Sequence, residues 1–139
     1  MSTVPQILTD ALERLPQPLF DPRPLWECVE VMEVDRAIAT ITELISLYLT
    51  DSLGYRERIL EAIAQKDDDA LRRAAHTLKS SSRSLGAAAL GELCESLEEH
   101  AIAKRFTLAS LQKRRFEKNF DDSLTILKQL QQDLSASIP

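Results

Sequence analysis

Apolar residues recur at intervals of three and four along most of this chain, which is the spacing of helices with one buried face. The clearest stripe begins near Val34 and continues in phase to Ile63, with Gly54 interrupting it. We therefore expect one long helix with a bend, or two nearly collinear helices. The stripe consists of Ala37, Ile38, Ile41, Leu44, Ile45, Tyr48, Tyr55, Ile59 and Ile63.

Start and stop signals delimit the next helix. Asp67, Asp68 and Asp69 supply a cap and favourable charge at its beginning. The helix should end near Leu85, because Gly86 suits the left-handed position just beyond a helix. Two further stripes predict the remaining long helices, one with Leu90, Leu93, Cys94, Leu97 and Ala101, and one with Phe116, Phe120, Leu124, Leu127 and Leu134.

The N-terminal part has a different character. Residues 5–15 show a short amphipathic pattern, and a proline-dense segment follows that cannot be helical throughout. Pro24 suits the first turn of another short helix that carries Trp26 and Val29. We expect residues 1–22 to form a short helix and linker, and residues 23–135 to form the main domain. Since no alternating strand pattern occurs, the sequence predicts an all-α, antiparallel helical bundle.

Composition narrows the possible functions. The chain has 139 residues, 28% of them charged, and a formal net charge of −5. Nucleic-acid binding is not expected without a basic surface, and the cluster Lys113, Arg114, Arg115 and Lys118 is interpreted as a solvated helix face. Cys28 and Cys94 lie too far apart for a CxxC unit, which favours free thiols. No signal peptide or membrane-spanning run is present, so we expect a cytoplasmic protein.

His76 lies on the wrong face of its helix for a core residue. The predicted core stripe of this helix is Leu71, Ala74, Ala75, Leu78, Ser82 and Leu85. At about 100° per residue, His76 lies about 140° from Leu71 and 160° from Leu78. The imidazole should therefore point to solvent, beside Arg72, Lys79, Ser80 and Arg83.

These neighbours argue against a metal site, because three cations would repel a metal ion and no set of ligands converges there. Cations instead attract an anion, and a neutral imidazole is a nucleophile that can carry a phosphoryl group. Lys79 would contact the phosphate oxygens as a point charge. The residue types alone leave two interpretations open, a phosphoryl carrier and a surface histidine without a role.

The wider stretch AAHTLKSSSRSLGAAALGELCESLEEHA closely resembles the central motif of histidine-containing phosphotransfer (HPt) domains. Those domains read A-H-x-L-K-G-S-x-x-x-L-G-A, followed by L-x-x-L-C-x-x-L-E. The residues that match are Ala75, His76, Leu78, Lys79, Ser81, Leu85, Gly86, Ala87, Leu90, Leu93, Cys94, Leu97 and Glu98.

The resemblance implies a four-helix bundle, here with additional short N-terminal helices, and a monomeric phosphocarrier of a two-component phosphorelay. It implies that His76 accepts a phosphoryl group on Nε2 and passes it between receiver-domain aspartates. The implied partners are response-regulator receiver domains and a sensor or hybrid histidine kinase, with neither nucleic acid nor membrane. No ATP-binding motif is visible, so we expect no autokinase activity and no cofactor bound by this chain, with Mg²⁺ supplied by the receiver.

Two residues refine this hypothesis. Ser80 stands where the family usually has glycine, one turn beyond His76, and would add a Cβ where a receiver approaches. His100 has Glu98 and Glu99 beside it in the sequence, so we assign it no phosphoryl role. The alternative function is a degenerate HPt-fold module that binds receivers without carrying phosphate. The short helix with Trp26, Val29 and Met32 is a candidate part of the docking surface.

Overall fold

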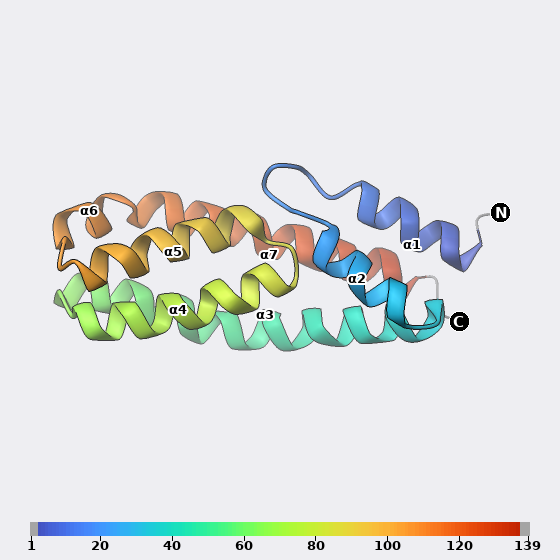
Figure 1. Ribbon diagram of the computed structural model, residues 1–139, viewed down its shortest axis with the longest axis horizontal. Coiled ribbons are helices and arrows are strands. Elements are labelled where there is room, and N and C mark those ends of the chain that lie inside the picture. Colours follow the sequence, from blue (N-terminus) through green and yellow to red (C-terminus); the bar gives the residue numbers. More distant parts are fainter. Residues whose placement is uncertain (1–2, 137–139) are drawn as a thin grey trace.

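Residues 3–136, the part of the chain that the computed structural model describes, form seven α-helices and no strand. Four long helices run antiparallel as a bundle (Figure 1), namely α3 (Val34–Gln65), α4 (Asp68–Ser84), α5 (Ala88–Ile102) and α7 (Lys113–Ser135). The short helices are α1 (Val4–Glu13), α2 (Arg23–Val31) and α6 (Phe106–Leu111). The predicted all-α bundle with short N-terminal helices is confirmed, whereas α6 was not predicted.

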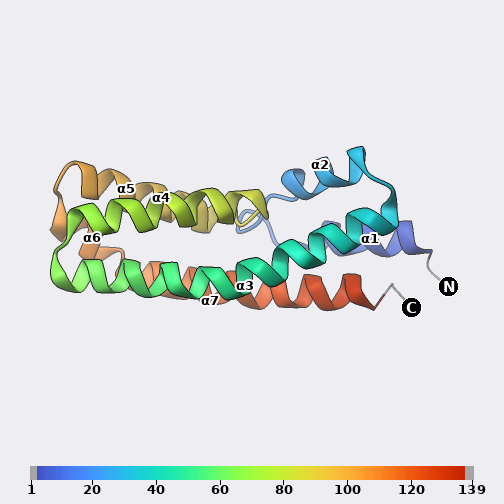
Figure 2. The same ribbon diagram turned by 90° about the horizontal axis from the view of Figure 1, so that it is seen from below.

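The connections determine which helices are neighbours. α4 packs against α5 and α3, while α7 packs against α3 and α5. α4 and α7 therefore lie diagonally across the bundle, as Figures 1 and 2 show together. The outward face of α4, which carries His76, consequently points away from the outward face of α7.

The long helix α3 is one continuous helix of 32 residues, and Gly54 lies inside it. Figure 2 shows that α3 changes direction along its length, so the alternative of one bent helix is the one observed. No atom lies within 4 Å of the position that a Cβ on Gly54 would occupy. Packing therefore does not require glycine at this position.

Both predicted boundaries of α4 are confirmed. The Asp67 carboxylate accepts a hydrogen bond of 3.1 Å from the backbone N–H of Ala70, which caps the helix. At the other end the backbone of Gly86 adopts a φ of 86°, which glycine tolerates best. The capped start and the sharp stop fix the length of α4 and its turn into α5.

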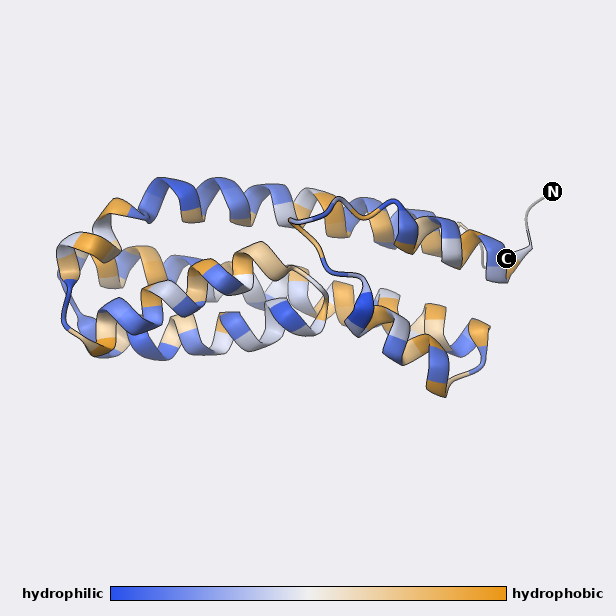
Figure 3. Cartoon of the chain, turned by 45° about the horizontal axis from the view of Figure 1, so that its top comes forward, coloured by the Kyte–Doolittle hydropathy of each residue, from blue (hydrophilic) through white to orange (hydrophobic). Residues whose placement is uncertain are grey.

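The core consists mainly of the inward faces of the long helices, and Figure 3 shows hydrophobic positions recurring among hydrophilic ones along the chain. Ile38, Leu78 and Phe120 are fully buried. Leu44 was predicted to belong to the core stripe but is 40% exposed, because the groove between α3 and α4 leaves it uncovered. No helix within residues 3–136 is both long enough and apolar enough to cross a bilayer.

The N-terminal segment contributes to the same core. Leu8 and Leu12 of α1 and Phe20 of the proline-dense segment are buried with the bundle residues. This segment wraps over the α4–α5 turn, where the N–H of Asp21 donates to the carbonyl of Gly86 at 2.7 Å. The division of the chain between residues 22 and 23 stays a prediction.

Candidate functional site

His76 lies midway along α4 and points to solvent, as its helical position predicts. Its side chain is 60% exposed, whereas Ala75 and Leu78 on either side are buried. This pattern follows from the helical repeat, which turns Ala75 and Leu78 toward the bundle and His76 away from it. The imidazole is thus held on a rigid helix and remains accessible to another molecule.

The partner of His76 comes from the neighbouring helix. A carboxylate oxygen of Glu98, on α5, lies 3.0 Å from Nδ1 of the imidazole. Burial raises the pKa of Glu98, but the contacts with Lys79 and His76 outweigh it and hold that pKa below its ordinary value. Since an ionised carboxylate only accepts hydrogen bonds, Nδ1 carries a hydrogen, and in the neutral ring Nε2 is then the nitrogen with the lone pair.

Lys79 shares the same carboxylate. Its Nζ lies 2.8 Å from the second oxygen of Glu98, and its side chain is only 18% exposed. The ammonium group is therefore ordered beside the imidazole rather than free in solvent. Glu98 joins the two residues that the sequence placed one turn apart on α4, so that an imidazole, an ammonium group and a carboxylate form one cluster.

The other predicted supporting residues have different roles. Arg72 forms an ion pair with Asp69 at 3.0 Å, and Arg83 forms one with Glu95 at 2.7 Å. Both guanidinium groups are thus engaged by carboxylates. The hydroxyl of Ser80 donates to the carbonyl of His76 at 3.4 Å, as a helical serine commonly does. It therefore points back along α4 and does not contact the imidazole ring.

Sequence reasoning overlooked Glu98 as a partner of His76. It placed Glu98 beside His100, but residues two apart on a helix point about 160° apart. His100 instead lies near Ser96, with 3.4 Å between its Nε2 and the serine hydroxyl. The glutamate at the end of the matched motif was the available signal, but pairing it with His76 requires the register of α4 against α5.

A groove runs between α3 and α4, and the residue after His76 is part of its lining. Its apolar section has a volume of about 340 Å³ and includes Leu44, Leu47 and Leu85. Thr77, the residue after His76, lines it together with Ser81. Leu47 is 55% exposed, so this section offers apolar surface to another protein on the side of α4 that carries Thr77.

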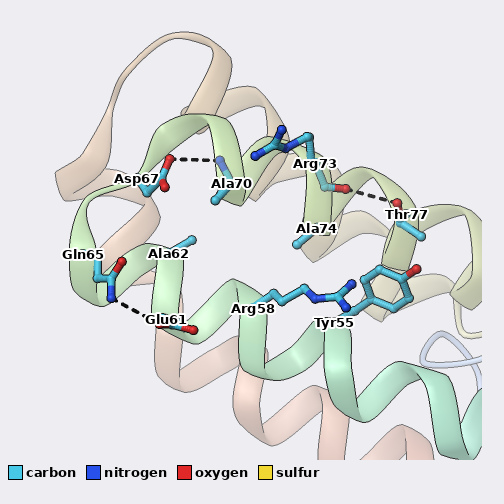
Figure 4. Close-up of a pocket in the computed structure, with 10 residues that line it drawn as sticks. All are labelled: Tyr55, Arg58, Glu61, Ala62, Gln65, Asp67, Ala70, Arg73, Ala74 and Thr77. Atoms are coloured by element: carbon cyan, nitrogen blue, oxygen red, sulfur yellow. Dashed lines mark hydrogen bonds between the residues drawn. The ribbon is translucent and has the colours of Figure 1, made fainter.

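The same groove continues into a polar section of about 520 Å³ toward the α3–α4 turn, shown in Figure 4. Tyr55 and Thr77 line both sections. The Arg58 guanidinium lies over the Tyr55 ring, 5.0 Å from its centre, and Arg73 lies at the opposite rim. A protein that contacts His76 would thus meet aliphatic side chains on one side and arginines on the other.

Two other kinds of reactive site, a cysteine nucleophile and a metal site, are not supported by the structure of the described residues. Cys94 is fully buried beneath this cluster, and burial raises the pKa of its thiol to about 12. A thiol with such a pKa is not a nucleophile at neutral pH. Across residues 3–136, no three His, Cys, Asp or Glu side chains gather in a way that would hold a metal ion.

Comparisons with known proteins agree with this geometry. Residues 43–137 match the family model of the Hpt domain. The structure is similar to that of histidine-containing phosphotransfer protein B (HptB) from Pseudomonas aeruginosa PAO1, with a TM-score of 0.73 and 30% sequence identity over 84% of this chain and 97% of that chain. No curated protein matches the chain significantly. Together, the matches support a phosphotransfer protein of a phosphorelay. This chain is a member of the Hpt domain family.

Proposed function

We propose that this chain carries a phosphoryl group on Nε2 of His76 between the aspartates of receiver domains, as a monomer in the cytoplasm. The observation that carries the proposal is the exposed imidazole whose Nδ1–H is held by Glu98. In the neutral ring, that hydrogen bond leaves Nε2 as the nitrogen with a free lone pair. HptB, the similar solved protein, is itself named as a histidine-containing phosphotransfer protein.

The proposed transfer is a simple displacement at phosphorus. The Nε2 lone pair forms the N–P bond while the P–O bond to the donor aspartate breaks, and the aspartate leaves as a carboxylate. The ring keeps its Nδ1 hydrogen and gains positive charge, which the Glu98 carboxylate stabilises at 3.0 Å. Transfer to the next receiver reverses these events. The chain thus needs no base to remove a proton from Nε2.

Lys79 is proposed to contact the phosphate oxygens. Its ammonium group already lies at the cluster through the ion pair with Glu98, so a small movement suffices to reach the phosphate. We propose that the chain binds no cofactor and that the receiver supplies Mg²⁺ together with its aspartate. The receiver would dock along the α3–α4 groove, whose apolar section adjoins Thr77.

A phosphotransfer profile tests this function. The full chain is mixed with each receiver domain of the host, labelled on its aspartate, and the label on the chain is followed over time. Transfer to this chain, with label that is lost in acid and stable in base, supports a phosphohistidine carrier. Receiver binding without any transfer would instead favour the interaction module that carries no phosphate.

Replacement of Glu98 by alanine should slow transfer about tenfold or more, because a charge-assisted hydrogen bond contributes about 1.5–3 kcal/mol. Glu98→Gln should lie between this variant and the wild type, since an amide oxygen still accepts from Nδ1–H. Single-turnover transfer gives the rates. NMR of the ring nitrogens should show that the population with hydrogen on Nδ1 falls in Glu98→Ala.

Glu95→Ala provides the control for Glu98, since Glu95 pairs with Arg83 on the same two helices. This variant should keep both the transfer rate and the ring tautomer. A Glu98→Ala protein that transfers as fast as the wild type would remove Glu98 from the mechanism.

Replacement of Ser80 by glycine should speed transfer about two- to fivefold, a change of about 0.4–1 kcal/mol in the barrier. The reason is steric, because the hydroxyl is directed to the His76 carbonyl and only the bulk of the side chain faces a docked receiver. Ser80→Ala keeps the Cβ and should transfer at nearly the wild-type rate. Stopped-flow transfer rates for the three proteins decide the matter.

Stability must be measured alongside, because glycine inside a helix costs about 0.5–1 kcal/mol relative to alanine. Slower transfer in both Ser80→Gly and Ser80→Ala would contradict the steric interpretation. That result would mean that the hydroxyl takes part in transfer.

Replacement of Leu47 by alanine should weaken receiver binding about threefold to tenfold, since truncation of an apolar side chain in an interface commonly costs about 1 kcal/mol. Leu53→Ala is the matched control, because Leu53 is 50% exposed on the same helix but does not line the groove. Titration calorimetry with the cognate receiver measures both. Equal weakening by the two variants would place the docking surface elsewhere.

A further inference from the structure

One stretch of this acidic chain has the opposite charge. Residues 100–116 contain five cations and no acidic residue, namely Lys104, Arg105, Lys113, Arg114 and Arg115. The rest of the chain then holds twelve cations against 22 acids, a formal charge of −10. The stretch covers the end of α5, all of α6 and the start of α7, and is called the basic segment below.

The cations of the basic segment are unpaired. All five are exposed, and within residues 3–136 none of them forms an ion pair. Two other cations near the start of α7 do have acidic partners. Lys118 pairs with Asp122 at 3.1 Å, and Arg56 lies 3.8 Å from Glu117. Unpaired charges of one sign, concentrated on a protein of the opposite net charge, are an electrostatic signal for an anionic partner.

Exposed apolar side chains accompany these charges. Ile102, Leu108 and Leu111 are 62%, 44% and 75% exposed, and they are three of the seven exposed large apolar residues within residues 3–136. Leu108 and Leu111 are one turn apart on α6. The surface of α7 is hollowed at its start, with about 350 Å³ lined by Arg114, Arg115, Lys118, Asn119 and Asp122. Arginines and exposed apolar residues in one segment of the chain are both residue types that protein-binding surfaces use.

The α7 part of the basic segment is remote from the proposed phosphoryl site, whereas the first residue of the segment, His100, lies two positions after Glu98 on α5. The α7 part of the segment lies diagonally across the bundle from α4 (Figures 1 and 2). Arg114 and Lys118 each lie two positions from the buried Phe116, about 160° around α7 by the helical repeat. Figure 3 shows this first half of α7 as largely hydrophilic on its visible side. A protein bound there would leave His76 accessible.

We propose that the basic segment docks an acidic, leucine-bearing segment of a partner protein, independently of the proposed transfer at His76. The cations of the basic segment would pair with the acidic residues of the partner. The exposed leucines of α6 would contact the aliphatic residues of the partner. A protein fits better than an anionic bilayer, because the remaining charge of −10 is repelled by such a surface. In addition, α6 has only six residues, which gives little apolar area to insert into lipid.

An array of synthetic acidic peptides tests this proposal. The peptides contain Asp and Glu with zero, one or two leucines at varied spacing, and bound members are titrated against the full chain by fluorescence anisotropy. We expect binding that requires leucine and weakens as salt rises to about 0.5 M, where charges are screened beyond a few ångström. Peptides without leucine that bind equally well would show charge attraction alone and overturn the proposal, as would an array without binders.

Matched variants locate the surface. Arg114→Glu should weaken peptide binding about fivefold or more, whereas Lys128→Glu, an equal charge change at another exposed and unpaired position of α7, should not. Leu111→Ser should weaken binding and Leu53→Ser should not. Thermal unfolding of each variant verifies the fold. Equal losses within either matched pair would overturn the assignment of this surface.

Two further measurements test whether the basic segment binds an anionic lipid surface or a second copy of this chain instead. Vesicles containing anionic lipid are sedimented with the chain, and sedimentation velocity measures the chain alone. Vesicle binding that Arg114→Glu abolishes, without leucine-dependent peptide binding, would assign the segment to a lipid surface. Self-association that Arg114→Glu abolishes would assign it to the acidic surface of a second copy. Either result would overturn the proposal.

Discussion

Replacement of His76 by glutamine is expected to reduce phosphoryl transfer to background while the fold stays intact. Glutamine has no nucleophilic ring nitrogen, so no N–P bond can form at this position. The side chain is 60% exposed, and substitutions at such positions usually change stability by about 0.5 kcal/mol or less. Labelled transfer from a receiver and thermal unfolding by circular dichroism measure the two effects.

His100→Gln is the matched control for His76. His100 is the other histidine of the chain, and it lies near Ser96 on α5 rather than on the exposed face of α4. This variant should keep the label. Undiminished labelling of the His76→Gln protein would refute the site assignment, and loss of its fold would refute the view that His76 makes no large structural contribution.

Replacement of Gly86 by alanine is expected to destabilise the protein by about 2–5 kcal/mol. A left-handed backbone costs an alanine about 1–2 kcal/mol, and the Gly86 φ of 86° lies in this region. In addition, the new Cβ would lie 2.3 Å from the backbone carbonyl oxygen of Asp21. Relief of this clash must move the N-terminal segment or the turn, which adds about 1–3 kcal/mol.

Thermal unfolding measures this loss as a fall of about 5–15 °C in Tm for a domain of this size. Gly54→Ala is the control, because a Cβ there meets no atom within 4 Å and the residue is inside α3. That variant should gain about 0.5–1 kcal/mol from helix propensity. A Gly86→Ala protein within about 0.5 kcal/mol of the wild type would contradict this account of the turn.

The Gly86 turn also bears on the site. It joins α4 to α5, so it helps to set which residue of α5 lies opposite His76. In the observed register that residue is Glu98, at 3.0 Å from Nδ1. The partial strain relief in Gly86→Ala should therefore disturb the His76–Glu98 contact as well as the stability.

The sequence by itself determined the local features of this protein. The helical repeat predicted the four long helices, the burial of Ser82 and Cys94 and the exposure of His76, and the structure confirms each of these. The cap at Asp67 and the left-handed Gly86 were likewise predictable. These features depend on a residue's own helix or turn, so the order of residue types along the chain is sufficient to specify them.

Only the tertiary structure decided which helices meet and in what register. Glu98 is 22 residues from His76, and their contact depends on how α4 and α5 slide and rotate against each other. Leu44 has the spacing of a core residue, but no neighbouring helix covers it. Arg83 forms an ion pair with Glu95 because α4 packs against α5. Arg72 forms an ion pair with Asp69 of its own helix, one of several acids nearby in the sequence. Contacts between helices depend on side-chain packing along the whole interface, which the periodicity of each single helix does not specify.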